Sequence, residues 1–312
     1  MSALSMALTD YLSLRRALGF KLYDDGLCLA RFVDFAEAEG AVFITRDVAV
    51  RWATQPVRAT PAHWASRLTM VRQFARYCSA LDARTEIPPA DLLPFRFRRK
   101  TPYIYSDQEI IRLLLAAKQL PSPTGLRAAT YTTVFGLLAV TGMRISEPLA
   151  LDRDDVDLER GALTICESKF GKSRWLPLHS TTRAALQRYV QRRDQVFPTV
   201  LTTSFFVSER GTRLTQWAVR GTFVKLSHKI GLRGPQDHYG PRLHDLRHRF
   251  AVRTLLNWYH AGVDVEQRLP ALAAYLGHAH VNDTYWYLSA IPELLALAAQ
   301  RLESDPAKEV AL

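Results

Sequence analysis

Cysteine is scarce in this sequence, which has three in 312 residues. Cys28, Cys78 and Cys166 are widely spaced, odd in number and free of any C-x-x-C pair. A disulfide framework needs an even set, and a thiolate zinc site needs closely spaced pairs. We therefore expect reduced thiols in the core and neither of these two kinds of site.

Long apolar runs are missing as well. No stretch approaches the roughly 20 residues that a membrane-spanning helix needs. The N-terminal stretch, MSALSMALTDYLSLRR, lacks the basic-then-apolar order of a signal peptide. Internal repeats and low-complexity tracts are also absent. These absences predict a folded protein of the bacterial cytoplasm or nucleoid, with no membrane partner.

Positive charge is what the sequence has in excess. Lysine and arginine number 41 against 30 aspartates and glutamates, which gives a net charge of +11 and a pI near 9.8. Such a charge suits a polyanionic partner, and nucleic acid is the leading candidate. It can equally serve solubility alone. The 48% hydrophobic content is enough for two domains of ordinary size or one large one.

Residues 1–95 show the periodicity of a small helical domain. Apolar residues recur at three- and four-residue spacings in LTDYLSLRRALGF, GLCLARFVDFAEAEG, TRDVAVRWATQ and TPAHWASRLTMVRQFARYCSAL. Thr45 and Thr60 are expected as N-caps, with Pro61 at a first helical position. Arginines near aromatic residues suit a phosphate-gripping face here, although a solvated helix surface explains them equally well. These residues are Arg58, Arg67, Arg72 and Arg76.

A basic segment, residues 96–104, follows as a predicted linker. It lies in IPPADLLPFRFRRKTPY, where prolines and positive charge replace apolar periodicity, so it could lie along a phosphate backbone. Its expected DNA contacts are Arg98, Arg99 and Lys100. A capping box of Ser106 and Glu109 then begins the second domain, residues 105–312.

The second domain combines helical patterns with one β-hairpin. LRAATYTTVFGLLAVTG predicts a buried helix that ends at Gly142. Further helices are expected at 180–194, 214–230, 243–260, 265–276 and 292–303. GALTICES and RWLPL predict two short strands around the turn KFGK. The expected fold class is therefore mainly α with a small antiparallel β-sheet, an α+β arrangement.

Polar residues concentrate in four segments of this domain: TGMRISE, SKFGKSR, HDLRHRF and LGHAHVNDTYWYLSA. Each segment alone has an ordinary explanation. Arg144 could pair with Glu147 three residues on. His244 and His248 share a helical face and could be satisfied polar residues at a surface.

Together the segments supply what cleavage of a phosphodiester by a tyrosine requires. A phenol has a pKa near 10, so its attack needs cations at the phosphoryl oxygens, a proton acceptor, and an acid for the leaving 5′-oxygen. Arginines grip such oxygens with fork geometry, and histidines move protons near neutral pH. A lysine on a hairpin tip can reach the leaving group. Such a site needs no metal or other cofactor.

In order and spacing the four segments resemble the motifs of the tyrosine recombinase, or phage integrase, family. The resemblance implies a two-domain architecture with an N-terminal helical core-binding domain. It also implies six catalytic residues: Arg144, Lys169, His244, Arg247, His278 and Tyr287. Lys169 is favoured over Lys172 because it precedes the glycine-containing turn. Glu147 and His248 would support these residues, and Lys172 and Arg174 would contact DNA.

Two tyrosines compete for the role of nucleophile. If their segment is helical, Tyr285 and Tyr287 point to nearly opposite faces, because two residues turn a helix by about 200°. The residues alone do not choose between them. The family spacing from His278 selects Tyr287 and leaves Tyr285, Trp286 and His280 as packing or phosphate contacts.

The function that the resemblance implies is site-specific DNA recombination. Strands of a specific duplex would be cleaved and rejoined through a 3′-phosphotyrosyl intermediate, without ATP or metal, for integration, excision or transposition of a mobile element. Four protomers would act on paired sites, joined through the helix IPELLALAAQRLE, which could equally pack on its own subunit. The stretch HVNDTYWYLSA with PELL shortly after it resembles transposon-associated integrases of the recombinase-in-trio type. This resemblance implies accessory recombinases as partners.

Three other functions remain open on the sequence alone. A type IB topoisomerase shares the chemistry but relaxes supercoils without sequence preference. A DNA-binding regulator of the same fold would not cleave. A zinc hydrolase built on His244, His248, His278 and His280 has a histidine pair at i and i+4, but it lacks the glutamate of H-E-x-x-H and gives the arginines no role.

Overall fold

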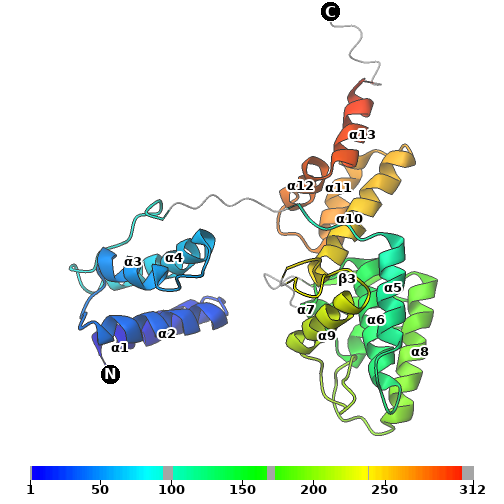
Figure 1. The fold of residues 1–312 in the computed structure, drawn as a ribbon, viewed down its shortest axis with the longest axis horizontal. Coiled ribbons are helices and arrows are strands. Elements are labelled where there is room, and N and C mark those ends of the chain that lie inside the picture. Colours follow the sequence, from blue (N-terminus) through cyan, green and yellow to red (C-terminus); the bar gives the residue numbers. More distant parts are fainter. Residues whose placement is uncertain (1, 94–100, 167–172, 238, 304–312) are drawn as a thin grey trace, which may run out of the picture. The chain divides into compact units, whose positions relative to one another are not determined.

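The computed structural model describes residues 2–93, 101–166, 173–237 and 239–303 (Figure 1). The chain divides into two compact units, residues 1–100 and 101–312, called unit 1 and unit 2 below. The division falls inside the predicted linker, 96–104. That unit 1 is a DNA-binding domain stays a prediction.

Unit 1 is helical, and the caps foreseen from the sequence are present. The Thr45 hydroxyl accepts a hydrogen bond from the backbone N–H of Val48 at 3.2 Å, and Thr60 accepts one from His63. Pro61 occupies the first helical position, where a missing N–H costs nothing. Its helices are α1 (Ala3–Ala17), α2 (Tyr23–Ala38), α3 (Arg46–Thr54) and α4 (Pro61–Cys78).

Unit 2 begins with helices that pack side by side in Figure 1. The helices α5 (Asp107–Lys118) and α8 (Ser180–Val196) both pack against α6 (Leu126–Thr141). The predicted capping box starts α5, because Ser106 and Glu109 each accept a hydrogen bond from the other's backbone N–H. The apolar α6 is largely buried, as its composition predicts, and it ends at Gly142 in the left-handed region.

A small antiparallel sheet carries the predicted hairpin. The strands β2 (Ala162–Ile165) and β3 (Arg174–Pro177) pair with Leu163 opposite Leu176, and both of these side chains are buried. A short strand, β1 (Val156–Asp157), extends the sheet beside β2. The sequence did not indicate β1, because two residues are too few to show alternation.

The C-terminal half of unit 2 forms a second hydrophobic core, separate from the one around α6. Its helices are α10 (Leu243–His260), α11 (Val265–Leu276), α12 (Asn282–Ala290) and α13 (Pro292–Glu303). The first turn of α10 buries Leu246 in the core around α6, whereas Leu255 lies in the second core. Residues 247 and 248 of α10 therefore lie where the two cores meet.

The helix α13 packs against α10 and α12 of its own unit, and Leu294 is fully buried there. The remaining helices of unit 2 are α7 (Ser146–Ala150) and α9 (Gln216–Lys229), with a 3-10 turn at Arg153–Asp155. The predicted fold class, mainly α with a small antiparallel sheet, is confirmed. In the part of the chain that the structure describes, no helix is both long and apolar enough to span a bilayer.

Candidate active site

A buried carboxylate organises the first part of the site. Glu147, at the start of α7, is 3% exposed at its side chain and accepts hydrogen bonds from two arginines. One oxygen lies 3.0 Å from Arg144 Nη1 and 3.0 Å from Arg174 Nη1, and the other lies 2.8 Å from Arg174 Nη2 and 2.9 Å from the Arg144 backbone N–H. Burial alone raises the pKa of Glu147, but Arg174 and Arg144 more than offset it and hold the pKa below its usual value.

Three consecutive backbone carbonyls at the C-terminal end of α11 accept hydrogen bonds from three arginines. Tyr275 O lies 2.8 Å from Arg174 Nε. Leu276 O lies 2.6 Å from Arg247 Nη2, and Gly277 O lies 2.6 Å from Arg144 Nη2. The last carbonyls of a helix lack intrahelical partners and carry the negative end of its dipole. The end of α11 therefore gathers positive charge at one place, called the arginine cluster below and defined by Arg144, Arg174, Arg247 and Glu147.

Arg247 is the most deeply buried member of the arginine cluster, with 2% of its surface exposed. Its second contact is a 2.9 Å hydrogen bond from Nη1 to Gly142 O, just after α6. Burial, and then the charge of Arg144, lower the pKa of Arg247 to about 10. The guanidinium thus keeps its charge at neutral pH.

Gly277 lets the arginines approach α11 this closely. Its φ is +69°, a region that favours glycine. A Cβ at this position would lie 2.8 Å from Arg174 Nη1 and 3.2 Å from Arg144 Nη1. Any side chain at residue 277 would therefore push the two guanidinium groups away, a steric role that the sequence analysis missed.

The predicted nucleophile lies beside α10. Tyr287 of α12 is 2% exposed, and its Oη lies 2.9 Å from Nδ1 of His248. The His248 ring in turn meets the ring of His244 edge-on, with 4.7 Å between centroids, and Trp286 at 5.7 Å. We call His244, His248, Trp286 and Tyr287 the tyrosine cluster. It adjoins the arginine cluster, because Arg247 lies between the two histidines in the chain and interacts electrostatically with Tyr287.

The tyrosine cluster keeps its histidines neutral. Burial, and to a smaller extent the charge of Arg247, lower the pKa of His244 to about 4. Removal from water, and then His244, lower the pKa of His248 to about 4. Both imidazoles are therefore neutral near pH 7, and each keeps one ring nitrogen that can accept a hydrogen bond.

The other candidate tyrosine lies on a different face of α12. Tyr285 is 43% exposed, whereas Tyr287 is buried, as the two-residue spacing predicts. His278 lies just beyond Gly277, and its Nδ1 is 2.7 Å from Oγ1 of Thr284, which is fully buried. The contact with Thr284 fixes the His278 ring between α11 and α12, another feature that the sequence analysis did not single out.

Several predicted site residues lie outside the described part of the chain. The strand β2 ends at Ile165 and β3 begins at Arg174, and both candidate catalytic lysines come between these two strands in the chain. The residues concerned are Arg98, Arg99, Lys100, Lys169 and Lys172. Arg174 itself was predicted as a DNA contact, but its hydrogen bonds place it in the arginine cluster.

The four basic residues predicted to grip phosphate in unit 1 have different surroundings. Arg58 and Arg76 are exposed. Arg67 stacks on the Trp52 ring, 3.6 Å from its centroid, and donates to Trp52 O at 2.7 Å. Arg72 is 8% exposed and donates to Pro88 O and Pro89 O. Because their donors already serve the unit's own backbone, Arg67 and Arg72 have a geometry that favours a structural role over the predicted one.

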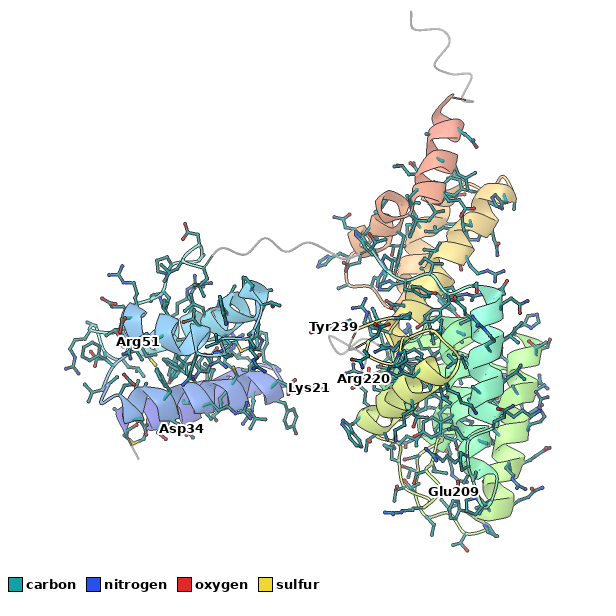
Figure 2. All side chains as sticks on the ribbon, viewed as in Figure 1. Lys21, Asp34, Arg51, Glu209, Arg220 and Tyr239 are labelled. Carbon is teal, nitrogen blue, oxygen red and sulfur yellow. The ribbon has the colours of Figure 1, made fainter. Side chains whose placement is uncertain are left out.

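One surface of α9 was not singled out by the sequence analysis. Trp217 is 85% exposed, and Arg220 and Lys225, spaced along the same helix, are exposed as well. Figure 2 shows Arg220 on the same side of unit 2 as Tyr239, which is 90% exposed. Gly221 lies in the middle of α9, and a Cβ there would meet nothing within 4 Å. A glycine in the middle of a helix lowers stability by about 1 kcal/mol relative to alanine. Because a larger side chain would fit at residue 221, packing against the described part of unit 2 does not explain the glycine.

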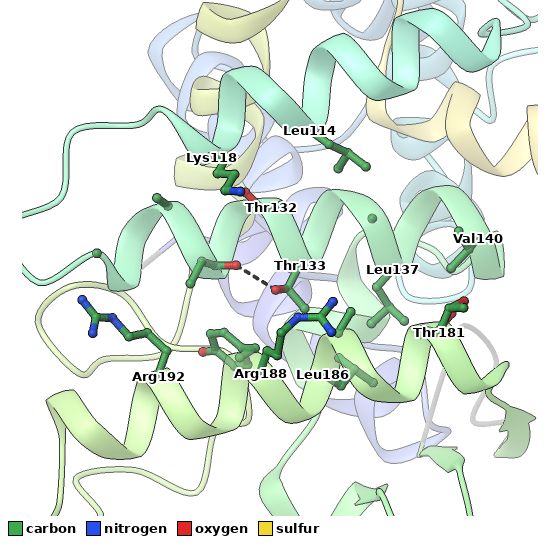
Figure 3. Close-up of a pocket in the computed structure, with 17 residues that line it drawn as sticks. Leu114, Lys118, Thr132, Thr133, Leu137, Val140, Thr181, Leu186, Arg188 and Arg192 are labelled. Carbon is green, nitrogen blue, oxygen red and sulfur yellow. Dashed lines mark hydrogen bonds between the residues drawn. The ribbon is translucent and has the colours of Figure 1, made fainter.

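A groove of about 670 Å³ lies elsewhere in unit 2, between α5, α6 and α8 (Figure 3). Its floor includes Thr133, which donates to Ala129 O at 2.8 Å. None of the candidate site residues lines it, so it plays no part in the site. Among the residues that the structure describes, no group of three or more His, Cys, Asp or Glu could hold a metal ion.

Comparison with known proteins identifies the family. Residues 104–293 match the Phage integrase family. The chain is 48% identical over 307 residues to a putative integrase/recombinase, y4rB, of Sinorhizobium fredii, covering 97% of this chain and 98% of that protein. It is 33% identical over 245 residues to the tyrosine recombinase XerD of Caulobacter vibrioides, covering 77% and 75%.

Solved structures share the fold. The Tn1549 transposon integrase in complex with transposon right-end DNA matches with a TM-score of 0.66 at 17% identity, covering 97% of this chain and all of that one (100%). The XerH site-specific recombinase in a post-cleavage complex with its difH substrate matches with a TM-score of 0.65 at 21% identity, covering 92% and 80%. The chain therefore belongs to the phage integrase family of tyrosine recombinases, the enzymes of site-specific DNA recombination.

Proposed function

We propose that this protein cleaves and rejoins strands of a specific duplex DNA site through a covalent bond between Tyr287 and the 3′-phosphate. The observation that carries the proposal is the meeting of the two clusters. A tyrosine hydroxyl lies beside neutral histidines, and a buried arginine that interacts with that tyrosine lies among two further guanidinium groups. This is the combination that attack by a phenol on a phosphodiester requires.

In this proposal, each group has one task. Arg144 and Arg247 hold the non-bridging oxygens of the scissile phosphate and neutralise the charge that develops on them. Glu147 and the end of α11 fix the arginines, so binding DNA requires no reorganisation of their side chains. His244 and His278 hold or move protons at the phosphate, and Lys169 protonates the leaving 5′-oxygen.

The bonds balance without an external energy source. The Tyr287 Oη–P bond forms as the P–O5′ bond breaks, so the phosphoryl group stays activated on the protein. The 5′-hydroxyl of a partner strand then attacks, which restores a phosphodiester and releases Tyr287. Two such exchanges recombine two duplexes.

DNA contacts outside the active site would set the position on the duplex. We assign these to the exposed arginines Arg58 and Arg76, to the basic segment 96–104, to Lys172 in the hairpin, and to the exposed face of α9. Gly221 has no side chain, and the space beside it is open. DNA can therefore approach the backbone of α9 more closely here than it could if residue 221 carried a side chain.

We further propose that four protomers assemble on two DNA sites, for integration, excision or transposition of a mobile element, and that partner recombinases can take part. Support comes from α13, which is short, amphipathic and joined to α12 directly after the nucleophile. In the structure α13 packs on its own unit and leaves Leu295 55% exposed. Exchange of α13 between protomers would couple assembly to the position of Tyr287.

A covalent-adduct experiment tests this proposal. The full chain is first used to select binding sequences from a random duplex library, and these are then nicked close to the cleavage point so that religation is blocked. Wild-type protein should form an SDS-resistant adduct in the presence of a chelator, and Tyr287→Phe should bind the same DNA without forming one. DNA binding without any adduct would support a regulator, and relaxation of supercoils without sequence preference would support a topoisomerase.

A further inference from the structure

We propose that His248 is a catalytic residue, whose Nδ1 takes the proton from the Tyr287 hydroxyl as that oxygen attacks the DNA phosphate. The role rests on the proposed function of Tyr287 as nucleophile. The resemblance to the family placed His244 and His278 among the catalytic residues and left His248 in support. The contacts of the three rings distinguish them.

The geometry favours His248. Its Nδ1 lies 2.9 Å from Tyr287 Oη, within the range of a hydrogen bond. The Nδ1 of His278 faces the Thr284 hydroxyl instead, at 2.7 Å. His244 meets His248 edge-on through its ring, one helical turn closer to the start of α10. His248 thus presents a ring nitrogen at hydrogen-bond distance from the oxygen that would attack the phosphate.

The surroundings hold the His248–Tyr287 pair in place. Rings of His244, Trp286 and Tyr287 lie around His248, with centroids 4.7, 5.7 and 5.6 Å away. Burial of Tyr287 keeps bulk water from competing for the hydrogen bond. The imidazole is therefore oriented by packing before DNA arrives, which is the condition under which a positioned base is effective.

His248 also has the required protonation state. Its lowered pKa, about 4, leaves it neutral near pH 7, so one ring nitrogen can accept the hydrogen bond from the phenol. The groups that set its charge environment are, on α10 and its cap, Arg242, His244, Asp245 and Arg247, and on α12, Tyr287. A DNA phosphate bound at Arg247 adds negative charge beside these cations. That charge raises the proton affinity of His248 at the moment when it is needed.

Written as a balanced step, the Oη–P bond of Tyr287 forms while the Oη–H proton moves to Nδ1 of His248. The P–O5′ bond breaks, and the leaving oxygen takes a proton from a different donor, for which Lys169 is proposed. In rejoining, the oxygen of a 5′-hydroxyl forms the new P–O5′ bond and gives its proton back to the leaving-group residue, while the P–Oη bond breaks and His248 returns its proton to Tyr287. The nucleophile side and the leaving-group side therefore use different residues, and this separation can be tested.

The test uses the full chain on the nicked duplexes selected above, in single-turnover cleavage. The variants are His248→Asn, whose amide can keep a hydrogen bond to Tyr287 but cannot act as a base, and His260→Asn, a matched control at the exposed end of the same helix. We expect His248→Asn to bind DNA like the wild type and to cleave at least about 100-fold more slowly, since a general base contributes about 10²–10⁴-fold. The cleavage rate of the wild type should decrease as pH falls, because His248 becomes protonated and can no longer act as a base. The cleavage rate of His248→Asn should not show this decrease. His260→Asn should cleave at the wild-type rate.

A second substrate places sulfur at the scissile 5′ position, a leaving group that needs no acid. This phosphorothiolate should restore cleavage to Lys169→Ala and not to His248→Asn. Rescue of His248→Asn by sulfur, cleavage by His248→Asn at the wild-type rate or faster, or a slow variant with an unchanged pH profile would each overturn the role of His248. Failure of the wild type to form an adduct would instead overturn the proposed function of Tyr287.

Discussion

Replacing Glu147 with glutamine tests how the arginine cluster is held together. The substitution keeps the size of the side chain and removes its charge. Four N–H groups now point at the carboxylate: the backbone N–H and Nη1 of Arg144, and both Nη atoms of Arg174. A glutamine can accept at one oxygen only, and its own NH2 group faces the remaining donors. Glu147→Gln therefore loses half of these contacts and leaves two partly buried cations short of a counter-charge.

The cost follows from the burial of the carboxylate. Its side chain is 3% exposed, so water cannot replace the lost partner. Hydrogen bonds to charged groups contribute about 1.5–3 kcal/mol each, and losing two of them costs about 3–6 kcal/mol. Removing one partner of a buried ion pair gives a similar figure, about 3–5 kcal/mol. We expect the free energy of unfolding of unit 2 to fall by that amount, and strand cleavage to fall because Arg144 is no longer fixed.

Urea denaturation of the full chain, followed by circular dichroism, measures the first effect, and adduct formation on a nicked duplex measures the second. The control is Glu159→Gln, which removes the same charge from an exposed position and should change the free energy of unfolding by less than about 0.5 kcal/mol. A Glu147→Gln protein with wild-type stability and wild-type cleavage would refute the claim that this carboxylate holds the arginine cluster.

Three further outcomes follow from the structure. Gly277→Ala places a Cβ 2.8 Å from a guanidinium nitrogen, at a residue whose φ is positive. It should abolish most strand cleavage and lower the free energy of unfolding by about 1–3 kcal/mol. Full cleavage activity would contradict the close approach of the arginines. Arg72→Ala should lower the stability of unit 1 by about 2 kcal/mol in thermal denaturation, and its affinity for DNA at permissive temperature should stay within about twofold of the wild type, since its donors serve backbone carbonyls; a large, selective loss of affinity would restore it as a phosphate contact. The pKa of His248 is lowered from 6.5 to about 4, so as pH falls this histidine is protonated in the unfolded chain before it is protonated in the folded one. The free energy of unfolding should therefore fall by about 2 kcal/mol as pH drops from 7 to 5. Urea titrations of His248→Asn should show a smaller decrease over the same pH range.

Local chemistry explains which parts of the fold were predictable. Ser106 and Glu109 stand three residues apart and satisfy each other's backbone, so the capping box is readable in the sequence and present in the structure. The hairpin strands alternate in the expected way, with Leu163 opposite Leu176. The strand β1 and the helix α7 were missed because elements of two and five residues are too short to show a period.

The site was predictable as a set of residues but not as a geometry. Backbone carbonyls occur at every residue, so nothing in the sequence marks three successive ones at the end of α11 as the acceptors for three arginines. The contact between His248 and Tyr287 joins residues that are 39 positions apart. Arginines present the same ambiguity in unit 1, because a guanidinium can grip phosphate or, as at Arg72, the chain's own carbonyls, and only tertiary contacts decide.

The claim that Tyr287 is the nucleophile is tested most directly by identifying the residue that carries DNA. Full-length protein is trapped on a selected nicked duplex, digested with protease and nuclease, and the modified peptide is sequenced by mass spectrometry. The account predicts a nucleotide attached to Tyr287 in the peptide that contains both tyrosines of α12, and an unchanged adduct in Tyr285→Phe. A nucleotide on Tyr285, or on any residue outside α12, would contradict it.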